Sequence, residues 1–229
     1  LVAGGQNGVA IYENGQWGKA ETDLGLVWSV AWSSDGSKLA VGGTGGVAIY
    51  ANDQWGDVMT ELGKVKKVAW NLDGSQLSAG GIWGVRIRAS GRWGEVKTDL
   101  GEVWRFSQRP GGTQLVAGGQ KGVAIYEDDQ WGEVKTDLGS VWNIAWRPDG
   151  SQLVAGGQNG VAIYENGQWG KVKMDLGKVS MVVWNSDGSK LVAEIENGVA
   201  IYANGVWAEV LRDFGGVWTV AWRPDAKRV

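Results

Sequence analysis

A repeat of fixed length constrains this chain more than any other feature of its sequence. Residues 1–12 and residues 153–164 both read LVAGGQNGVAIY, and they lie four repeat lengths of 38 residues apart. Units of this length begin at Val27, Val65, Val103, Val141 and Val179. A sixth unit begins at Val217 and stops at residue 229, and residues 2–26 match the part that it lacks, so that Leu1 and Val229 correspond to the same position. The sequence therefore predicts six copies of one supersecondary unit.

Each unit contains four apolar runs separated by turn signals. VWSVAW alternates, which predicts a strand with Trp28, Val30 and Trp32 on one face. A turn such as Arg-Pro-Asp-Gly at 147–150 leads to the second run, a Gly-rich turn leads to GVAIY, and Asn-Gly links that run to WGKVKTDL. A lone four-stranded sheet cannot bury both faces without neighbours, so the repeat predicts an all-β, six-bladed β-propeller of four-stranded antiparallel blades.

The interrupted unit predicts how such a ring closes. We expect one domain over residues 1–229, with blades at 27–64, 65–102, 103–140, 141–178 and 179–216, and a sixth blade made of 217–229 plus 1–26. In this arrangement the N- and C-terminal strands share one blade, and no unpaired sheet edge remains where the ends meet.

The segment VWNIAWRPDGSQLVAGGQNGVAIY (141–164) resembles the WD40 repeat family. The resemblance extends over all six units, although Leu138-Gly139 replaces the family's Gly-His pair and Tyr126-Glu127 its Trp-Asp pair. It implies a propeller on which the blade-joining loops and the turns between second and third strands share one partner-binding rim. A shorter pattern, Ile163-Tyr164 followed by Trp169 and Leu176, is similar to tectonin-type lectins.

Composition excludes several kinds of chemistry. The chain has no Cys and no His, so it has no disulfide, no thiolate metal site and no Ser-His-Asp triad. The net charge of −3 provides no basic footprint for nucleic acid, and no apolar run is long enough for a membrane span. We expect no cofactor, no metal and no catalytic residue, and the compartment and the oligomeric state remain open.

Two sets of the 16 tryptophans recur in a manner typical of structural residues. The first set begins the fourth run of every unit: Trp17, Trp55, Trp93, Trp131, Trp169 and Trp207. The second set ends the first run of every unit except one, where Gln108 stands: Trp32, Trp70, Trp146, Trp184 and Trp222. Burying an indole removes about 200 Å² from water, which is worth about 5 kcal/mol. We expect both sets in the core between blades.

A third tryptophan position varies and is the candidate for binding. The residue after the opening Val is Trp28, Trp104, Trp142 or Trp218 in four units, and Lys66 or Ser180 in the others. A core position seldom accepts all three residue types, so this slot is predicted to be partly exposed.

The joining loop also carries one acid per unit: Asp23, Glu61, Asp99, Asp137, Asp175 and Asp213. The aromatic and acidic residues suit a sugar ring or a basic side chain of a protein partner. The alternative is structural, with each acid holding its own turn and each Trp covering the central channel.

Other motifs have simpler interpretations. Gly4–Gly8 and Gly156–Gly160 precede strands, so they indicate hairpin turns and not phosphate loops, which need a following helix. Carboxylates repeated in every unit favour valency over catalysis, since a catalytic site is usually singular.

The second and fifth units depart most from the consensus. The second contains Lys66, Lys67, Trp83, Arg86, Arg88 and Arg92, and the fifth contains Glu194, Ile195 and Glu196. Three units apart in a ring of six, these blades are expected to face each other across its axis. Either drift on a solvated rim or a polar orientation for a partner explains this difference.

These observations predict a binding protein and not an enzyme. The first hypothesis is a WD40-like protein-interaction scaffold that uses one rim, and the alternative is a multivalent lectin with repeated Trp and Asp sites whose avidity multiplies. The candidate rim residues are Trp28, Trp104, Trp142, Trp218, Lys66, Trp83, Asp23, Asp99, Asp137, Asp175 and Asp213.

Overall fold

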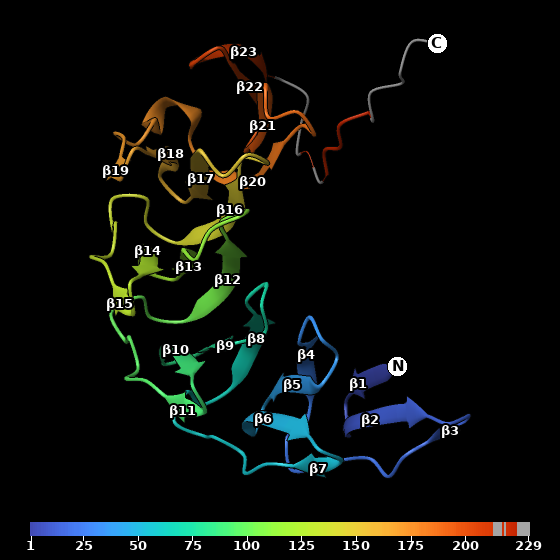
Figure 1. Ribbon diagram of the computed structural model, residues 1–229. Coiled ribbons are helices and arrows are strands. Elements are labelled where there is room, and N and C mark those ends of the chain that lie inside the picture. Colours follow the sequence, from blue (N-terminus) through green and yellow to red (C-terminus); the bar gives the residue numbers. More distant parts are fainter. Residues whose placement is uncertain (213–216, 218, 224–229) are drawn as a thin grey trace. The chain divides into compact units, whose positions relative to one another are not determined.

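The computed structural model describes residues 1–212, 217 and 219–223, without the side chains of residues 208–210. The fold is all-β, and each sheet is formed by strands that are consecutive in the chain, as the colours of Figure 1 show. Six antiparallel sheets follow one another at the spacing of the repeat, which confirms the predicted class and agrees with a six-bladed propeller.

The strands have the following bounds. The first sheet contains β1 (Val2–Gly5), β2 (Gly8–Glu13) and β3 (Gln16–Trp17); the second β4 (Val27–Trp32), β5 (Lys38–Gly43), β6 (Gly46–Ala51) and β7 (Gln54–Trp55); the third β8 (Val65–Trp70), β9 (Gln76–Gly81), β10 (Gly84–Ala89) and β11 (Arg92–Trp93). The fourth contains β12 (Val103–Gln108), β13 (Leu115–Gly119), β14 (Gly122–Glu127) and β15 (Gln130–Trp131); the fifth β16 (Val141–Trp146), β17 (Gln152–Gly157), β18 (Gly160–Glu165) and β19 (Gln168–Trp169); the sixth β20 (Val179–Trp184), β21 (Lys190–Ile195), β22 (Gly198–Ala203) and β23 (Val206–Arg212). A single-turn 3-10 helix, η1 (Met174–Leu176), precedes β20.

The chain divides into two compact units, residues 1–106 and residues 107–229, and packing is described within each. The single domain predicted from the sequence stays a prediction. In both units a core cluster takes residues from two consecutive sheets: Val154 and Val161 pack with β20–β22, and Ala40 and Val47 pack with Val65 and its neighbours. The predicted burial of each sheet against the next is therefore observed within the units.

The hairpin chemistry follows the sequence. Asn14 and Gly15 have φ values of 51° and 83°, and Asn166 and Gly167 have 51° and 79°, so both pairs form the two-residue turn that requires left-handed backbone at both positions. Leucines from the joining loops and from the second strands are fully buried and form the centre of the core: Leu24, Leu39, Leu62, Leu77, Leu100, Leu138, Leu153 and Leu191.

The fourth strand is shorter than predicted in five sheets. It covers only two residues, followed by a single bridge such as Val9 to Glu21. In these five sheets a glycine directly follows the fourth-strand tryptophan and weakens the strand at that point. In the last sheet Ala208 replaces this glycine, and β23 continues for seven residues.

The two structural tryptophan sets lie less deeply than predicted. Trp146 and Trp184 are buried, but Trp32, Trp70 and Trp222 are half-buried. In the fourth-strand set Trp17 is 50% exposed and the other five are half-buried. In five sheets the third strand has a tyrosine, and the fourth-strand tryptophan packs against its ring. The ring centroids of Tyr50 and Trp55, for example, are 5.2 Å apart. The fourth strand is the outer edge of its sheet, so this packing covers the sheet edge and not the centre of the core.

Ring closure falls largely outside the described residues. Of the segment expected to complete the first sheet, Val217 and residues 219–223 are described, and they form no strand. Trp222 nevertheless donates a hydrogen bond from Nε1 to the carbonyl of Val183 at 2.9 Å, as Trp70 does to Ala31 at 3.0 Å in the other unit. The described part of the segment thus contacts the last sheet as one sheet contacts the next, and its pairing with β1 stays a prediction.

Candidate functional site

The candidate site is the rim that contains the joining loops and the turns between second and third strands. We call it the joining-loop rim. Main-chain hydrogen bonds connect its two components: Thr44 N donates to Leu26 O at 3.0 Å, and Asn159 N donates to Leu138 O at 3.0 Å. Five joining loops are each anchored by a buried leucine: Leu24, Leu62, Leu100, Leu138 and Leu176. The shared rim that the WD40 resemblance implies is therefore present in both units.

The variable slot coincides with a β-bulge. In four first strands the register shifts by one residue at the slot, so that Trp28, Lys66, Trp142 and Ser180 have no partner on the second strand. A bulged residue leaves the ladder, and its side chain is redirected. This explains why the slot accepts Trp, Lys and Ser, although the sequence of the first strand alone does not predict a bulge.

The bulge also corrects one predicted face. Because of the extra residue, Val65 and Val68 point the same way, and both approach Gly42 of the preceding sheet. Strict alternation predicts Trp28, Val30 and Trp32 on one face, but the extra residue places Trp28 on the other face from Val30. Strict alternation requires an unbroken ladder, and the bulge interrupts it at the slot.

The slot residues are partly exposed, as predicted. Trp28 is 43% exposed, Lys66 and Ser180 are exposed, and Trp104 and Trp142 are half-buried. Trp83, in the turn between β9 and β10, is 57% exposed and lies over the joining loop, 3.3 Å from the place of a Cβ on Gly63. Trp218 and Asp213 lie outside the described residues.

The aspartates of the joining loops do not pair with the slot residues. Asp99, Asp137 and Asp175 are each held at 2.9 Å by the lysine two positions earlier, and Glu61 pairs with Arg86. The bond from Lys173 lowers the pKa of the Asp175 carboxyl. Asp23 lacks such a lysine, and its main-chain N–H donates to Glu21 at 3.0 Å. Asp99, Asp137 and Asp175 therefore pair within their own outer strand and turn, whereas Glu61 pairs with the third strand of the next sheet.

Another acid, which the sequence analysis did not select, meets the slot. Glu102 forms an ion pair of 2.6 Å with Lys66 from the preceding sheet. Hydrogen bonds from Lys66 and then Trp104 lower the pKa of Glu102 against the opposing effect of burial. The structure thus brings Lys66, Glu102 and Trp104 together. The signal was present in the sequence, since Glu102 directly precedes Val103, the opening Val of the next unit.

No group of three or more side chains that could hold a metal is present among the described residues. In the same part of the chain no helix has the length and apolar character that a membrane crossing needs.

Comparison with known protein families gives one match. The family model for WD40, described as WD domain, G-beta repeat, matches residues 20–50 and 132–164. Both regions run from the end of the outer strand through the joining loop to the third strand, so the two matches have the same position in the repeat. The resemblance to WD40 repeats is confirmed in these two regions. No curated protein matches the chain.

Proposed function

We propose that this chain is a non-enzymatic binding module, a WD40-like protein-interaction scaffold that binds its partner through the joining-loop rim. The observation that carries the proposal is the bulge at the slot. In four first strands it removes one residue from the ladder and leaves it at least partly exposed on the rim, where the fold does not constrain its identity. A surface that varies on a constant framework is typical of recognition.

The compact unit of residues 1–106 indicates the chemistry of the partner. Its third sheet exposes Lys64, Lys66, Lys67 and Trp83 on the rim, and Trp28 is exposed on the second sheet. The starts of these first strands are neighbours, because Val68 N donates to Ser29 Oγ at 3.2 Å. Exposed indoles among lysines suit a partner segment that carries acidic and apolar side chains.

The same features favour binding over catalysis. The chain lacks His and Cys, the most frequent general base and the strongest nucleophile at neutral pH. The repeated joining-loop acids are engaged by lysines in three units. WD40 repeats, which match two regions, are typically non-catalytic.

The test uses the chain as bait with a matched control. A protein captured by the parent chain is purified, and its affinity is measured for the parent, for Trp28→Ala/Trp83→Ala and for Trp17→Ala. Trp17 is equally exposed, at 50%, but lies on the outer strand and not on the rim. We expect the rim variant to bind at least about tenfold more weakly and Trp17→Ala to bind as the parent does. Equal affinity of the rim variant and the parent would contradict the proposal.

The alternative is a multivalent lectin. It is favoured by the near-identity of the units and by the exposure of Trp28, whose ring is available for stacking on a sugar. A glycan array separates the hypotheses. A signal that Trp28→Ala/Trp142→Ala abolishes supports the lectin, and the absence of any signal from the parent chain removes it.

A further inference from the structure

A second candidate binding site lies at the opposite end of the sheets from the joining-loop rim. It is a cavity of about 230 Å³ in the second unit, between the fifth and sixth sheets. Its lining includes Arg147, Gln152, Trp184, Ser189, Tyr202 and Asn204. Arg147 and Ser189 belong to the turns between first and second strands, and Asn204 belongs to the turn between β22 and β23.

Two buried N–H groups at this cavity lack an acceptor. Trp184 is only 9% exposed, and its Nε1 has no hydrogen-bond partner; Nε of Arg147 has none either. The equivalent indoles of Trp70 and Trp222 donate to a carbonyl of the preceding sheet. A buried donor without an acceptor is destabilising, so a ligand that supplies an acceptor would be bound more tightly.

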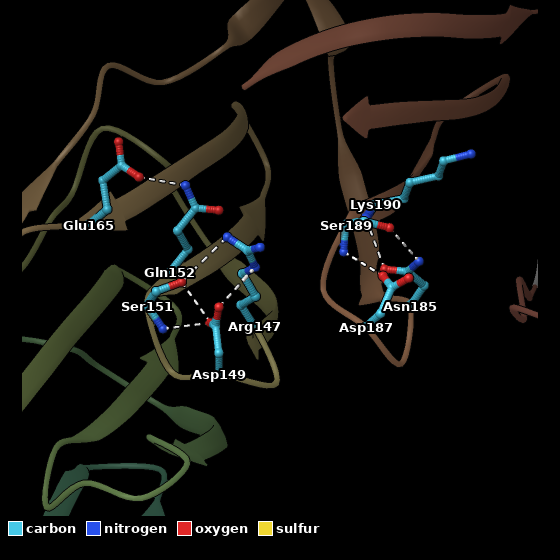
Figure 2. Close-up of polar contacts among 9 residues, drawn as sticks. All are labelled: Arg147, Asp149, Ser151, Gln152, Glu165, Asn185, Asp187, Ser189 and Lys190. Carbon is cyan, nitrogen blue, oxygen red and sulfur yellow. Dashed lines mark hydrogen bonds and ion pairs between the residues drawn. The ribbon is translucent and has the colours of Figure 1, made fainter. Parts of the chain in front are cut away.

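Arg147 is fixed in place but incompletely paired. Its guanidinium lies over the Trp184 ring, 5.8 Å from the centroid, and it crosses Gly188, where a Cβ would lie 2.8 Å from Nε. Its contacts are long: Nε lies 3.4 Å from Asp149 Oδ2, and Nη1 lies 3.5 Å from Ser151 Oγ (Figure 2). Charge-assisted bonds of arginine normally measure about 2.7–2.9 Å, so the guanidinium can still accept an anion.

Asp149 does not saturate this arginine, because Ser151 holds its carboxylate. Ser151 donates to Asp149 Oδ1 from its main-chain N at 2.9 Å and from its hydroxyl at 2.6 Å. These two bonds are the main reason that the pKa of Asp149 is lowered. Asp187 in the next sheet is likewise engaged, since Ser189 N donates to it at 2.7 Å (Figure 2).

Two other polar groups of the cavity wall are paired or neutral. Gln152 Nε2 donates to the Glu165 carboxylate. Burial and the charge of Glu165 raise the pKa of Tyr202, so its hydroxyl stays protonated at neutral pH. The ring of Tyr202 meets that of Trp184 edge to face at 6.2 Å and forms an apolar wall.

We propose that this cavity binds a carboxylate from an acidic side chain of a peptide, with Arg147 and the Trp184 indole N–H as its donors. One carboxylate oxygen accepts from Trp184 Nε1, and the guanidinium binds the group electrostatically and by hydrogen bonds. The volume lies below the range of about 300–1,000 Å³ typical of small-molecule sites and suits a single side chain. This site is independent of the proposed rim function, because it shares no residue with the joining-loop rim.

The chain contains a matched control. Arg109 precedes a proline as Arg147 does, and it lies over Trp146 at 5.6 Å. Its Nη1, however, donates to Gln114 Oε1 at 3.1 Å, a normal hydrogen bond to a buried partner. The Trp146 Nε1, like that of Trp184, has no hydrogen-bond partner. The two sites therefore differ in the arginine: Arg109 has a hydrogen bond of ordinary length, whereas Arg147 has only the long contacts to Asp149 and Ser151.

The test follows the indole N–H signals of the full chain labelled with ¹⁵N-tryptophan, with the Trp184 signal assigned by Trp184→Phe. The probes are acetyl-glutamate amide, its neutral analogue acetyl-glutamine amide, acetyl-alanine with a terminal carboxylate, and inorganic phosphate. We expect acetyl-glutamate amide to move the Trp184 signal downfield and to saturate below about 50 mM, which corresponds to a weak single-group affinity. Arg147→Met should weaken this binding at least about tenfold, and Arg109→Met should leave it unchanged.

Each other outcome is decisive. An unmoved Trp184 signal, or an equal response to acetyl-glutamine amide, overturns the proposal. If acetyl-alanine binds more tightly than acetyl-glutamate amide, the ligand is a chain terminus and the proposed acidic side chain is overturned. If phosphate binds more tightly than acetyl-glutamate amide, the proposal of a carboxylate ligand is overturned. If circular dichroism shows that Arg147→Met is unfolded, Arg147→Lys decides in its place. It retains the charge but lacks the planar fork, so unchanged affinity in that variant overturns the role of the guanidinium.

Discussion

Glycines on the second strands allow successive sheets to approach, and Gly42 offers the sharpest test of this packing. A Cβ built on Gly42 would lie 2.7 Å from Cγ1 of Val65 and 3.2 Å from Cγ1 of Val68, both on the following sheet. It would also lie 3.1 Å from the carbonyl oxygen of Val65. The backbone of Gly42 does not need left-handed φ, so alanine is opposed by this contact alone.

The magnitude of Gly42→Ala follows from two opposing effects. Overpacking a close-packed contact costs about 1–3 kcal/mol. Alanine restricts the unfolded chain more than glycine does and returns about 0.4–1 kcal/mol. We therefore expect a net loss of about 1–2 kcal/mol in the free energy of unfolding. For a chain of this length the melting temperature should fall by about 2–8 °C.

The assay is urea denaturation followed by tryptophan fluorescence and circular dichroism. Gly56→Ala is the matched control, because the nearest atom to its Cβ would be the Ile49 oxygen at an ordinary 3.4 Å. It should stay within about 0.5 kcal/mol of the parent. Removing the opposing methyl groups with Val65→Ala should relieve the clash, so the double variant Gly42→Ala/Val65→Ala should show a coupling of at least about 0.5 kcal/mol. Unchanged or increased stability of Gly42→Ala, or strictly additive losses, would refute the reasoning.

Two further predictions concern the end of the sheets that is opposite the joining-loop rim. Hydrogen bonds from Ser33 and Ser37 lower the pKa of Asp35 from 3.8 to about 2, so the ionised carboxylate stabilises the fold above pH 3.8 and this contribution disappears as the pH falls towards 2. Carboxyl ¹³C titration should give a midpoint near 2 for Asp35, and Asp35→Asn should flatten the loss of stability in this range; a midpoint near 3.8 would contradict it. Trp70→Phe removes the bond to the Ala31 carbonyl, whereas Trp184→Phe removes a donor without an acceptor. In urea denaturation Trp70→Phe should therefore lose about 1 kcal/mol more than Trp184→Phe, and equal losses would show that the bond contributes nothing.

The sequence predicted those features that depend on local chemistry repeated six times. The sheets, the order of their strands and the Asn-Gly turns at Asn14 and Asn166 follow from apolar alternation and from residues that tolerate positive φ. The exposure of the slot followed from its variability, since Trp28 and Lys66 occupy equivalent positions. Variation among units supplied the information that an alignment of relatives normally supplies.

The features that were missed depend on contacts between neighbouring strands and sheets. Nothing in VWSVAW shows that Trp28 is a bulge residue, because the bulge is defined by Gly42 and Gly43 on the adjacent strand. Likewise, Trp184 and Trp70 occupy equivalent positions, yet only Trp70 has an acceptor. The difference coincides with Arg147, which lies over Trp184, and only three-dimensional placement reveals this relation.

The junction after the sixth sheet departs from the other junctions. Five sheets have a glycine on the second strand that faces the first valine of the next sheet. A Cβ added to this glycine would lie within 2.9 Å of Cγ1 of that valine at Gly4, Gly42, Gly80, Gly118 and Gly156. The equivalent residue of the sixth sheet is Glu194, which is 8% exposed. Val217, the valine at the corresponding place, is half-buried, whereas Val179 is fully buried. At this junction a carboxylate side chain thus takes the place of the glycine, and the valine that follows is less buried than its equivalents.

Ring closure can therefore be tested at a residue far from that junction. A Cβ on Gly43 would lie 2.6 Å from the Leu24 oxygen and 2.7 Å from the Leu26 oxygen, both in the joining loop, whereas a Cβ on Gly5 meets nothing within 4 Å. If the closing strand pairs with β1 in the register of β4 with β5, Val217 lies opposite Gly5, and the loop before Val217 fills the space beside Gly5. We expect closure, so Gly5→Ala should destabilise the chain by at least about 1 kcal/mol in urea denaturation, as Gly43→Ala does. An open first sheet would instead make Gly5→Ala neutral or stabilising by up to about 1 kcal/mol, since only the unfolded chain would be affected. If Gly5→Ala is neutral or stabilising while Gly43→Ala is destabilising, the N- and C-terminal strands do not share one blade.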